Sequence, residues 1–343
     1  MRVLVGMSGG VDSSVAAALL RDRGHEVAGV TLKLWGGASD TGCCSVADVD
    51  DARWAADRLG VEHHVFNFGA EFDRHVVAPY VEAHAAGRTP NPCVECNRHV
   101  KFDALLERAL ALGFDAVATG HHARIATRAD GTRRVARGAD GAKDQSYVVG
   151  VLDQHQLART LFPVGGLTKG EVRAIAARLG LANAAKPDSQ EVCFVQRAEG
   201  RAGFLADRLA LHPGRVLDPA GAEVGSVAAV ELVTVGQRHG LGLPGGHEPR
   251  YAVAVDVPGR TVTVGTAAEL QVRATALGPL TWAASPAEIG GRYDAQTSAH
   301  GVPAPVTLGD GEVRWHEPRR RVAPGQLVVL YEGGQVAGSA VAR

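Results

Sequence analysis

The segment "RVLVGMSGGVDSS", residues 2–14, carries the strongest signal for the structure of the N-terminal half of the chain. Its opening apolar run, Arg2–Gly6, is typical of a short buried strand, and the pattern that follows predicts a helix from about Asp12. Between them, glycines let the backbone approach an anion, while Ser8, Ser13 and the N–H groups of the helix start supply donors. The segment therefore predicts a phosphate-binding loop between a strand and a helix.

This loop differs from the two common nucleotide-binding loops. No lysine follows its glycines, as G-x-x-x-x-G-K-[ST] requires, and the glycine spacing is not G-x-G-x-x-G. Asp12 would repel a phosphate unless a Mg²⁺ ion lay between them, so a metal-chelated pyrophosphate is the expected ligand. The structural alternative is a glycine-rich turn that only caps a helix.

The first half of the chain continues to alternate strands with helices. Further strands are expected at 27–35, 63–68 and 115–120, and further helices at 46–59, 71–86 and 98–112. A hairpin around "ADGT" and a helix that begins at the capping box Thr168–Glu171 follow. This order predicts an α/β domain whose mostly parallel sheet carries helices on both faces, with ligands at the carboxyl ends of the strands.

After about Gly200 the helical periodicity fades, and short alternating strands appear between dense glycines and prolines. Such a pattern is typical of small β-rich, barrel-like domains. We expect three domains, at 1–200, 201–268 and 269–343: a catalytic domain, a central small β domain and a C-terminal β-barrel.

The bulk properties exclude several classes of protein. The 343-residue chain has a formal net charge of −1, so no global charge draws it to nucleic acid or to a membrane. No run approaches the ~18–20 apolar residues of a membrane span, and the N-terminus has no leader pattern. Five cysteines, an odd number, argue against a secreted disulfide framework. A soluble cytoplasmic protein with reduced thiols and no membrane partner is expected.

Two cysteines form a C-x-x-C pattern in "RTPNPCVECNRHVKF", at Cys93 and Cys96. The spacing alone allows half a zinc site, a redox dithiol, part of an iron–sulfur site, or a nucleophile with an unrelated neighbour. Cys193 stands alone, and an isolated cysteine is usually a small buried apolar residue. The adjacent Cys43 and Cys44 are expected to be structural or incidental.

The phosphate-loop sequence "SGGVDSS" after the first strand resembles the N-type ATP pyrophosphatases, or PP-loop enzymes. These enzymes activate a carbonyl oxygen by adenylation and release pyrophosphate. The loop alone does not choose among members such as GMP synthetase, NAD synthetase, argininosuccinate synthetase and the tRNA thiolases.

Six further segments narrow the resemblance. They are, in order, "GRTPNPCVECNRHVKF", "ATGHHAR", "GADGAKDQSYVV", "LFPVGGLTKGEVR", "KPDSQEVCFV" and "VGQRHGLGL". Together they resemble the tRNA-specific 2-thiouridylases, which thiolate U34 at the wobble position. The resemblance runs from residue 1 to about Leu243 and is loose thereafter.

The resemblance implies a role for particular residues. It makes Cys96 the catalytic nucleophile and Cys193 the carrier of a persulfide. The implied ATP-binding residues are Gly6, Met7, Ser8, Gly9, Gly10, Val11, Asp12, Ser13, Leu32 and Gly120. The implied tRNA-binding residues are Asn91, Pro92 and Cys93 around the target base, together with Lys143, Asp144 and Gln145.

The resemblance also implies cofactors and partners. ATP and Mg²⁺ are expected, with tRNAs that read Lys, Glu and Gln codons as substrates. Sulfur would come from a cysteine desulfurase, either directly or through a relay protein. The six basic residues between Arg124 and Lys143 would contact phosphates around the anticodon arm.

The chain departs from the resembled family at Cys93, where aspartate is common. A thiol cannot replace that carboxylate unchanged, since the reference pKa is ~8.5 for Cys and ~3.9 for Asp. The cysteine at position 93 also completes a set of three thiols, Cys93, Cys96 and Cys193. These could hold a [4Fe–4S] cluster as the sulfur donor. A persulfide route and a cluster route both remain open, as do an adenylating ligase of a small molecule and a non-catalytic RNA-binding protein.

Overall fold

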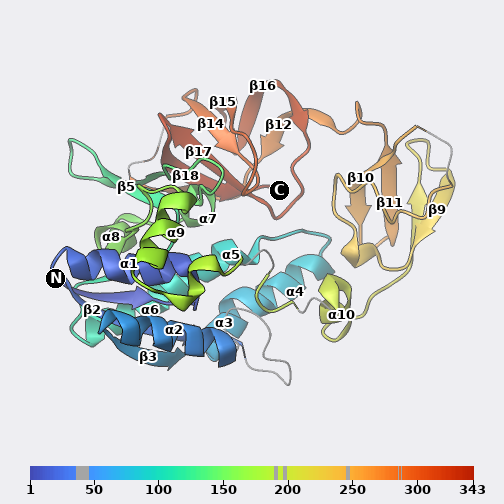
Figure 1. The fold of residues 1–343 in the computed structure, drawn as a ribbon. Helices are drawn as coiled ribbons and strands as arrows, with labels where there is room; N and C mark the ends of the chain where they lie inside the picture. The colour runs from blue at the N-terminus through green and yellow to red at the C-terminus, as the bar shows by residue number, and fades with distance from the viewer. Residues whose placement is uncertain (36–45, 189–191, 196–198, 245–247, 285, 287) are drawn as a thin grey trace.

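The computed structural model describes residues 1–35, 46–188, 192–195, 199–244, 248–284, 286 and 288–343 (Figure 1). Cys43 and Cys44 lie outside these residues, as does the middle of the "DSQEVCFV" segment.

A five-stranded sheet forms the centre of the N-terminal domain. Its order is β3-β2-β1-β4-β7, and all four pairings are parallel. The strands are β1 (Arg2–Gly6), β2 (Glu26–Lys33), β3 (Glu62–Asn67), β4 (Ala116–Thr119) and β7 (Thr160–Leu161). The chain winds outward from β1 in both directions, so the topological switch point lies between β1 and β4. The predicted parallel α/β sheet is confirmed.

Alternation along β1 divides the apolar residues between the two faces of the sheet. Val3 and Val5 share a buried cluster with residues of α1 (Val11–Asp22), α2 (Val46–Leu59) and α9 (Lys169–Arg178). Leu4 belongs to the cluster on the opposite face. Because successive strand side chains point to opposite faces, one short apolar strand supports both layers.

The opposite face is covered by two long helical segments that contain π-helical stretches. The first joins α3 (Gly69–Phe72), η1 (Asp73–Val77) and α4 (Ala78–Ala85), and the second joins α5 (Pro92–Glu95), η2 (Cys96–Ala104) and α6 (Leu105–Ala111). The prediction that the second segment starts at Arg98 was wrong. Asn91 caps the helix by accepting from the Cys93 N–H, and Pro92 occupies the first turn, so both cysteines lie in the helix.

Shorter helical pieces complete the first 206 residues. They are α7 (Ser146–Val149), α8 (Gln154–Ala158), η3 (Ala182–Ala185) and α10 (Gly200–Ala206). Figure 1 shows α10 beside a four-stranded sheet on the right, of order β10-β11-β8-β9. Its strands are β8 (Gly214–Leu217), β9 (Glu223–Val227), β10 (Tyr251–Asp256) and β11 (Thr261–Gly265), and the one-turn helix η4 (Val230–Leu232) lies between β9 and β10. This sheet has its own apolar cluster.

The C-terminal part is also β-rich, as expected. Its strands are β12 (Gln271–Ala276), β13 (Thr281–Trp282), β14 (Arg292–Gln296), β15 (Ala304–Leu308), β16 (Glu312–Arg320), β17 (Leu327–Glu332) and β18 (Gln335–Val341). They pair antiparallel around a separate buried cluster. No helix among the described residues is long and apolar enough to cross a membrane.

The predicted hairpin is present as β5 (Ala123–Thr127) and β6 (Arg133–Arg137), but it extends the C-terminal sheet. Strand β6 pairs antiparallel with β18 through Ala136 and Gln335. Arg134 and Arg137 then bind Glu332 and Gln296, each at 2.7 Å. Arg134 and Arg137 therefore anchor the two domains to each other, a role that charge alone could not distinguish from phosphate binding.

Candidate active site

The phosphate loop lies at the switch point of the parallel sheet, directly after β1. The Ser8 N–H donates to Ser13 Oγ at 3.3 Å, and that hydroxyl donates to the Gly10 carbonyl at 3.1 Å. Gly9 has φ of +73°, and a side chain there would meet the backbone of Asp48. The loop therefore keeps a fixed, tight shape, with the first N–H groups of α1 directed at its opening.

Gly120, at the end of β4, packs directly against this loop. A Cβ atom at Gly120 would lie 2.5 Å from the Ser13 nitrogen and 2.7 Å from the Asp12 carbonyl carbon. Only glycine permits this approach. Leu32, near the end of β2, is half-buried and packs against the cluster on the α6 side. The structure thus brings the predicted loop residues and Gly120 together. Leu32 lies near the end of β2, the strand that pairs with β1 on the side away from β4.

Asp12 accepts hydrogen bonds from two side chains that belong to distant segments of the chain. Lys169 Nζ lies 2.7 Å and 2.8 Å from its two carboxylate oxygens, and His122 Nε2 lies 3.1 Å from one of them. Burial acts to raise the pKa of Asp12, but the bonds from His122 and Lys169 outweigh it, and the net pKa is lowered. Asp12 is therefore held as a carboxylate inside the loop.

The same lysine also binds Asp188, so two carboxylates share one ammonium group. Lys169 Nζ lies 2.7 Å from Asp188, which also pairs with Lys143 at 2.8 Å and Arg173 at 3.3 Å. The sequence motifs did not predict a role for Lys169 or Asp188. Their segments were recognised only as parts of a family pattern, and nothing in a linear sequence shows that Lys169 meets Asp12.

Asp188 should impose a pH dependence on stability. Burial acts to raise its pKa, but Lys143 and Lys169 lower it to about 2 from an ordinary value of 3.8. A carboxyl with a lowered folded-state pKa stabilises the fold above its unfolded pKa and loses that effect as pH falls towards the folded value. The wild type should therefore exceed Asp188→Asn in stability at pH 5–7, and the difference should shrink between about pH 4 and pH 2. Chemical unfolding at several pH values measures this, and a difference that grows as pH falls would contradict it.

Cys96 lies at the start of η2 and is 6% exposed. It belongs to the same buried cluster as Val100 and Phe102. The two basic residues that follow it, Arg98 and His99, face Glu95 at 4.0 Å and 3.4 Å. The guanidinium of Arg98 is thus directed at a carboxylate one turn away, while burial lowers the pKa of His99.

Cys193 is half-buried and packs against the cluster that contains Cys96. Its neighbour Phe194 is buried among four aromatic rings, with centroid distances between 5.0 and 6.3 Å. These rings are those of Trp35, Phe72, Tyr80 and Phe204. Phe194 therefore anchors the short segment that carries Cys193, a positioning residue that the sequence motif contained without revealing its role.

Cys93 differs from the other two thiols because it is exposed. Desolvation by surrounding protein raises the pKa of its thiol, while Lys101 acts in the opposite direction. Across the described residues, which include all three of these cysteines, no three His, Cys, Asp or Glu side chains form a group that could hold a metal ion. Cys93, Cys96 and Cys193 are thus not gathered into a ligand set among the described residues, and the cluster route stays a prediction.

The expected tRNA-binding residues have internal partners. Asp144 accepts bonds from Arg137, from the Gly138 N–H and from Ser146, and its side chain is 5% exposed. Gln145 Oε1 accepts from the His122 N–H at 2.9 Å. The segment thus connects the wall of the phosphate site to the C-terminal domain, and its contact with tRNA stays a prediction.

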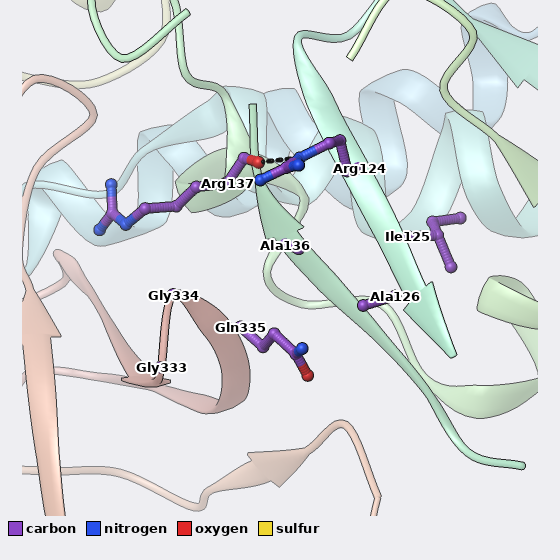
Figure 2. A pocket seen from close by; sticks show the side chains of 8 residues that line it. All are labelled: Arg124, Ile125, Ala126, Ala136, Arg137, Gly333, Gly334 and Gln335. Atoms are coloured by element: carbon purple, nitrogen blue, oxygen red, sulfur yellow. Dashed lines mark hydrogen bonds between the residues drawn. The ribbon is translucent and has the colours of Figure 1, made fainter. Parts of the chain in front are cut away.

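Two cavities lie where the C-terminal strands meet the N-terminal domain. One, of about 390 Å³, lies between the β5–β6 hairpin and the β17–β18 turn (Figure 2). Its lining includes Arg124 and Arg137, two of the basic residues expected to contact tRNA phosphates, but none of the expected catalytic or ATP-binding residues. Figure 2 shows the bond from Arg124 Nε to the Arg137 carbonyl, which is 2.7 Å long, above it. The other, of about 200 Å³, is lined by Asn91 and Glu95 from the Cys96 segment and by Leu327 from β17.

A phosphate loop at the switch point of a parallel sheet, closed by a strand-end glycine, defines an ATP-binding α/β domain of the PP-loop class. Three protein-family models match consecutive parts of the chain. They are described as the tRNA methyl transferase HUP domain, matching residues 1–197, the tRNA methyl transferase PRC-barrel domain, matching 202–266, and the aminomethyltransferase beta-barrel domain, matching 272–342.

Curated relatives are similar over nearly the whole chain. A protein named tRNA-specific 2-thiouridylase MnmA from Streptomyces avermitilis is 49% identical, with 99% of this chain and 94% of the relative aligned. A protein of the same name from Beutenbergia cavernae is 48% identical, again with 99% and 94% aligned. The chain belongs to the family of tRNA-specific 2-thiouridylases.

Proposed function

We propose that this protein uses ATP to replace the 2-oxygen of uridine 34 with sulfur in tRNAs that read Lys, Glu and Gln codons. The observation that carries the proposal is the pairing of a phosphate loop with two cysteines, Cys96 and Cys193, that contact one buried cluster on the same sheet. Neither feature alone would separate a thiolase from other adenylating enzymes.

The chemistry explains why ATP is needed. The C2 carbonyl of uracil is a poor electrophile, because its oxygen is a poor leaving group. In the first step, O2 attacks the α-phosphorus of ATP, and the electron pair of the broken P–O bond leaves with pyrophosphate. Adenylated O2 can then depart as AMP. Asp12 fits the role of binding the Mg²⁺ that accompanies the triphosphate.

Sulfur then arrives from a cysteine persulfide on Cys193. The terminal sulfur attacks C2 and AMP leaves, so the base is joined to Cys193 through an S–S bond. The Cys96 thiolate attacks Cys193 Sγ, the electron pair passes to the sulfur on C2, and 2-thiouridine is released. The resulting Cys96–Cys193 disulfide needs a thiol reductant before the next cycle. A cysteine desulfurase, directly or through a relay protein, supplies the persulfide.

Access of the base to these groups requires that it leave the anticodon stack. The cavity of about 200 Å³ beside Asn91 lies between the Cys96 segment and strand β17. Asn91 lines this junction of two domains, and Pro92 and the exposed Cys93 follow it in the chain, so an extruded nucleotide could be held here.

An in vitro thiolation assay tests the proposal. Purified protein, Mg²⁺·ATP, a cysteine desulfurase with cysteine, and an unmodified tRNA transcript should yield 2-thiouridine at position 34, with one AMP per sulfur transferred. A transcript with cytidine 34 should not react, and chelator-treated, iron-free protein should keep its activity. Pyrophosphate exchange that depends on an amino acid and not on tRNA would identify a small-molecule ligase instead.

A further inference from the structure

We propose that Lys169 is the cation that binds the triphosphate of ATP and stabilises the departing pyrophosphate. The inference rests on the proposed function and adds an ATP-binding residue to the same site. The phosphate loop itself contains a carboxylate, Asp12, and no lysine. Its helix start contributes only about half a positive charge. The loop therefore needs a positive group from elsewhere in the chain.

The geometry points to Lys169 as that group. It is the first residue of α9, which packs beside α1, and its ammonium already lies 2.7 Å from the loop carboxylate. The start of α9 is held rigidly, because Thr168 and Glu171 form a capping box and the Lys169 N–H donates to Asp140 at 3.0 Å. The lysine side chain is 11% exposed, so its charge acts where water screens it weakly.

The partners of Lys169 allow it to exchange one anion for another. Asp188 retains Lys143 and Arg173 if Lys169 turns towards phosphate, so this half-buried carboxylate does not lose all its cations. Asp12 retains His122, whose Nδ1 is buried without a partner. The Asp12 carboxylate would then be available to Mg²⁺. In the absence of nucleotide, Lys169 and Asp12 thus neutralise each other, and with Mg²⁺·ATP each would take an ion of opposite charge.

Lys169 would contribute to the reaction electrostatically. As uracil O2 bonds to the α-phosphorus, the bond to the bridging oxygen breaks and its electron pair moves onto pyrophosphate. A fixed ammonium close to that developing charge lowers the barrier without any proton transfer. Loss of one such donor commonly reduces rates by on the order of 10²- to 10³-fold.

Lys169→Met removes the charge and keeps most of the side-chain volume. We expect tRNA-dependent pyrophosphate release to fall about 100-fold and affinity for α,β-methylene-ATP to weaken, with tRNA affinity unchanged. Lys169→Arg should recover part of the activity. Lys186→Met is the matched control, since Lys186 also binds two carboxylates, Asp48 and Asp51, at 2.6 Å. It should change pyrophosphate release less than threefold or so.

Further readouts separate this inference from the proposed function. Sulfur labelling of Cys193 by a desulfurase needs no ATP, so Lys169→Met should accept label like the wild type. Thermal melting and the arginine variant show whether the methionine variant is folded. Wild-type nucleotide affinity and pyrophosphate release in folded Lys169→Met would overturn the role of Lys169 alone. A wild type that releases no pyrophosphate with tRNA would overturn the proposed function.

Discussion

Replacing Cys96 with serine is expected to reduce 2-thiouridine formation by on the order of 10³-fold or more while tRNA-dependent pyrophosphate release continues. A serine hydroxyl is not ionised near neutral pH and cannot resolve an S–S bond as a thiolate does. The substitution also fits the site, because Cys96 is 6% exposed in an apolar cluster and serine is slightly smaller. Adenylation depends on the phosphate loop and should be spared.

Cys193→Ser provides the comparison that assigns the two thiols. It should abolish the persulfide label from the desulfurase, whereas Cys96→Ser should retain that label. Added sulfide should rescue Cys193→Ser in part, because hydrosulfide can attack an adenylated base without a carrier. Gel-based detection of thiolated tRNA and labelled protein measures both outcomes. Full thiolation by Cys96→Ser, or label retained by Cys193→Ser, would exclude the two-cysteine mechanism in this form.

The sequence predicted helices well where the hydrophobic periodicity agreed with helix-capping residues. Helix α2 occupies Val46–Leu59 as expected, and the capping box at Thr168–Glu171 starts α9. The predicted helix at 98–112 instead begins too late, because the Asn91–Pro92 pair is itself a helix-start signal. As a result the cysteines were placed before the helix, and the π-helical turn that begins at Cys96 was missed.

Long-range contacts set the limit of the sequence interpretation. Asp12 and Lys169 are 157 positions apart, and no local pattern encodes their contact. The basic hairpin illustrates the same limit, because the charge of Arg134 was visible in the sequence but its partner Glu332 was not. A charged side chain reveals what kind of group it can bind, whereas the fold decides whether that group belongs to the protein or to a ligand.

The second large effect is expected at Gly120, the strand-end glycine that packs against Asp12 and Ser13 of the phosphate loop. Gly120→Ala would place a methyl group 2.5 Å from the Ser13 nitrogen, closer than atoms of the backbone can tolerate. Since β4 is buried and parallel-paired on both sides, the strand cannot move away, so the loop must shift. A displacement of about 1 Å at a reacting site can lower activity by on the order of 10²-fold.

Use of ATP should therefore fall by about 100-fold in Gly120→Ala, whereas overpacking should lower the free energy of unfolding by only about 1–3 kcal/mol. Gly166→Ala is the matched control, because its added methyl would meet nothing within 4 Å and the residue is exposed. Titration with α,β-methylene-ATP and thermal melting separate a displaced loop from a damaged fold. Normal nucleotide affinity in Gly120→Ala would mean that the loop can yield without losing its function, and the strand-end glycine would then serve packing alone. Weak affinity in a protein that melts close to the wild type would show that the close approach of β4 holds the loop in the shape that binds phosphate.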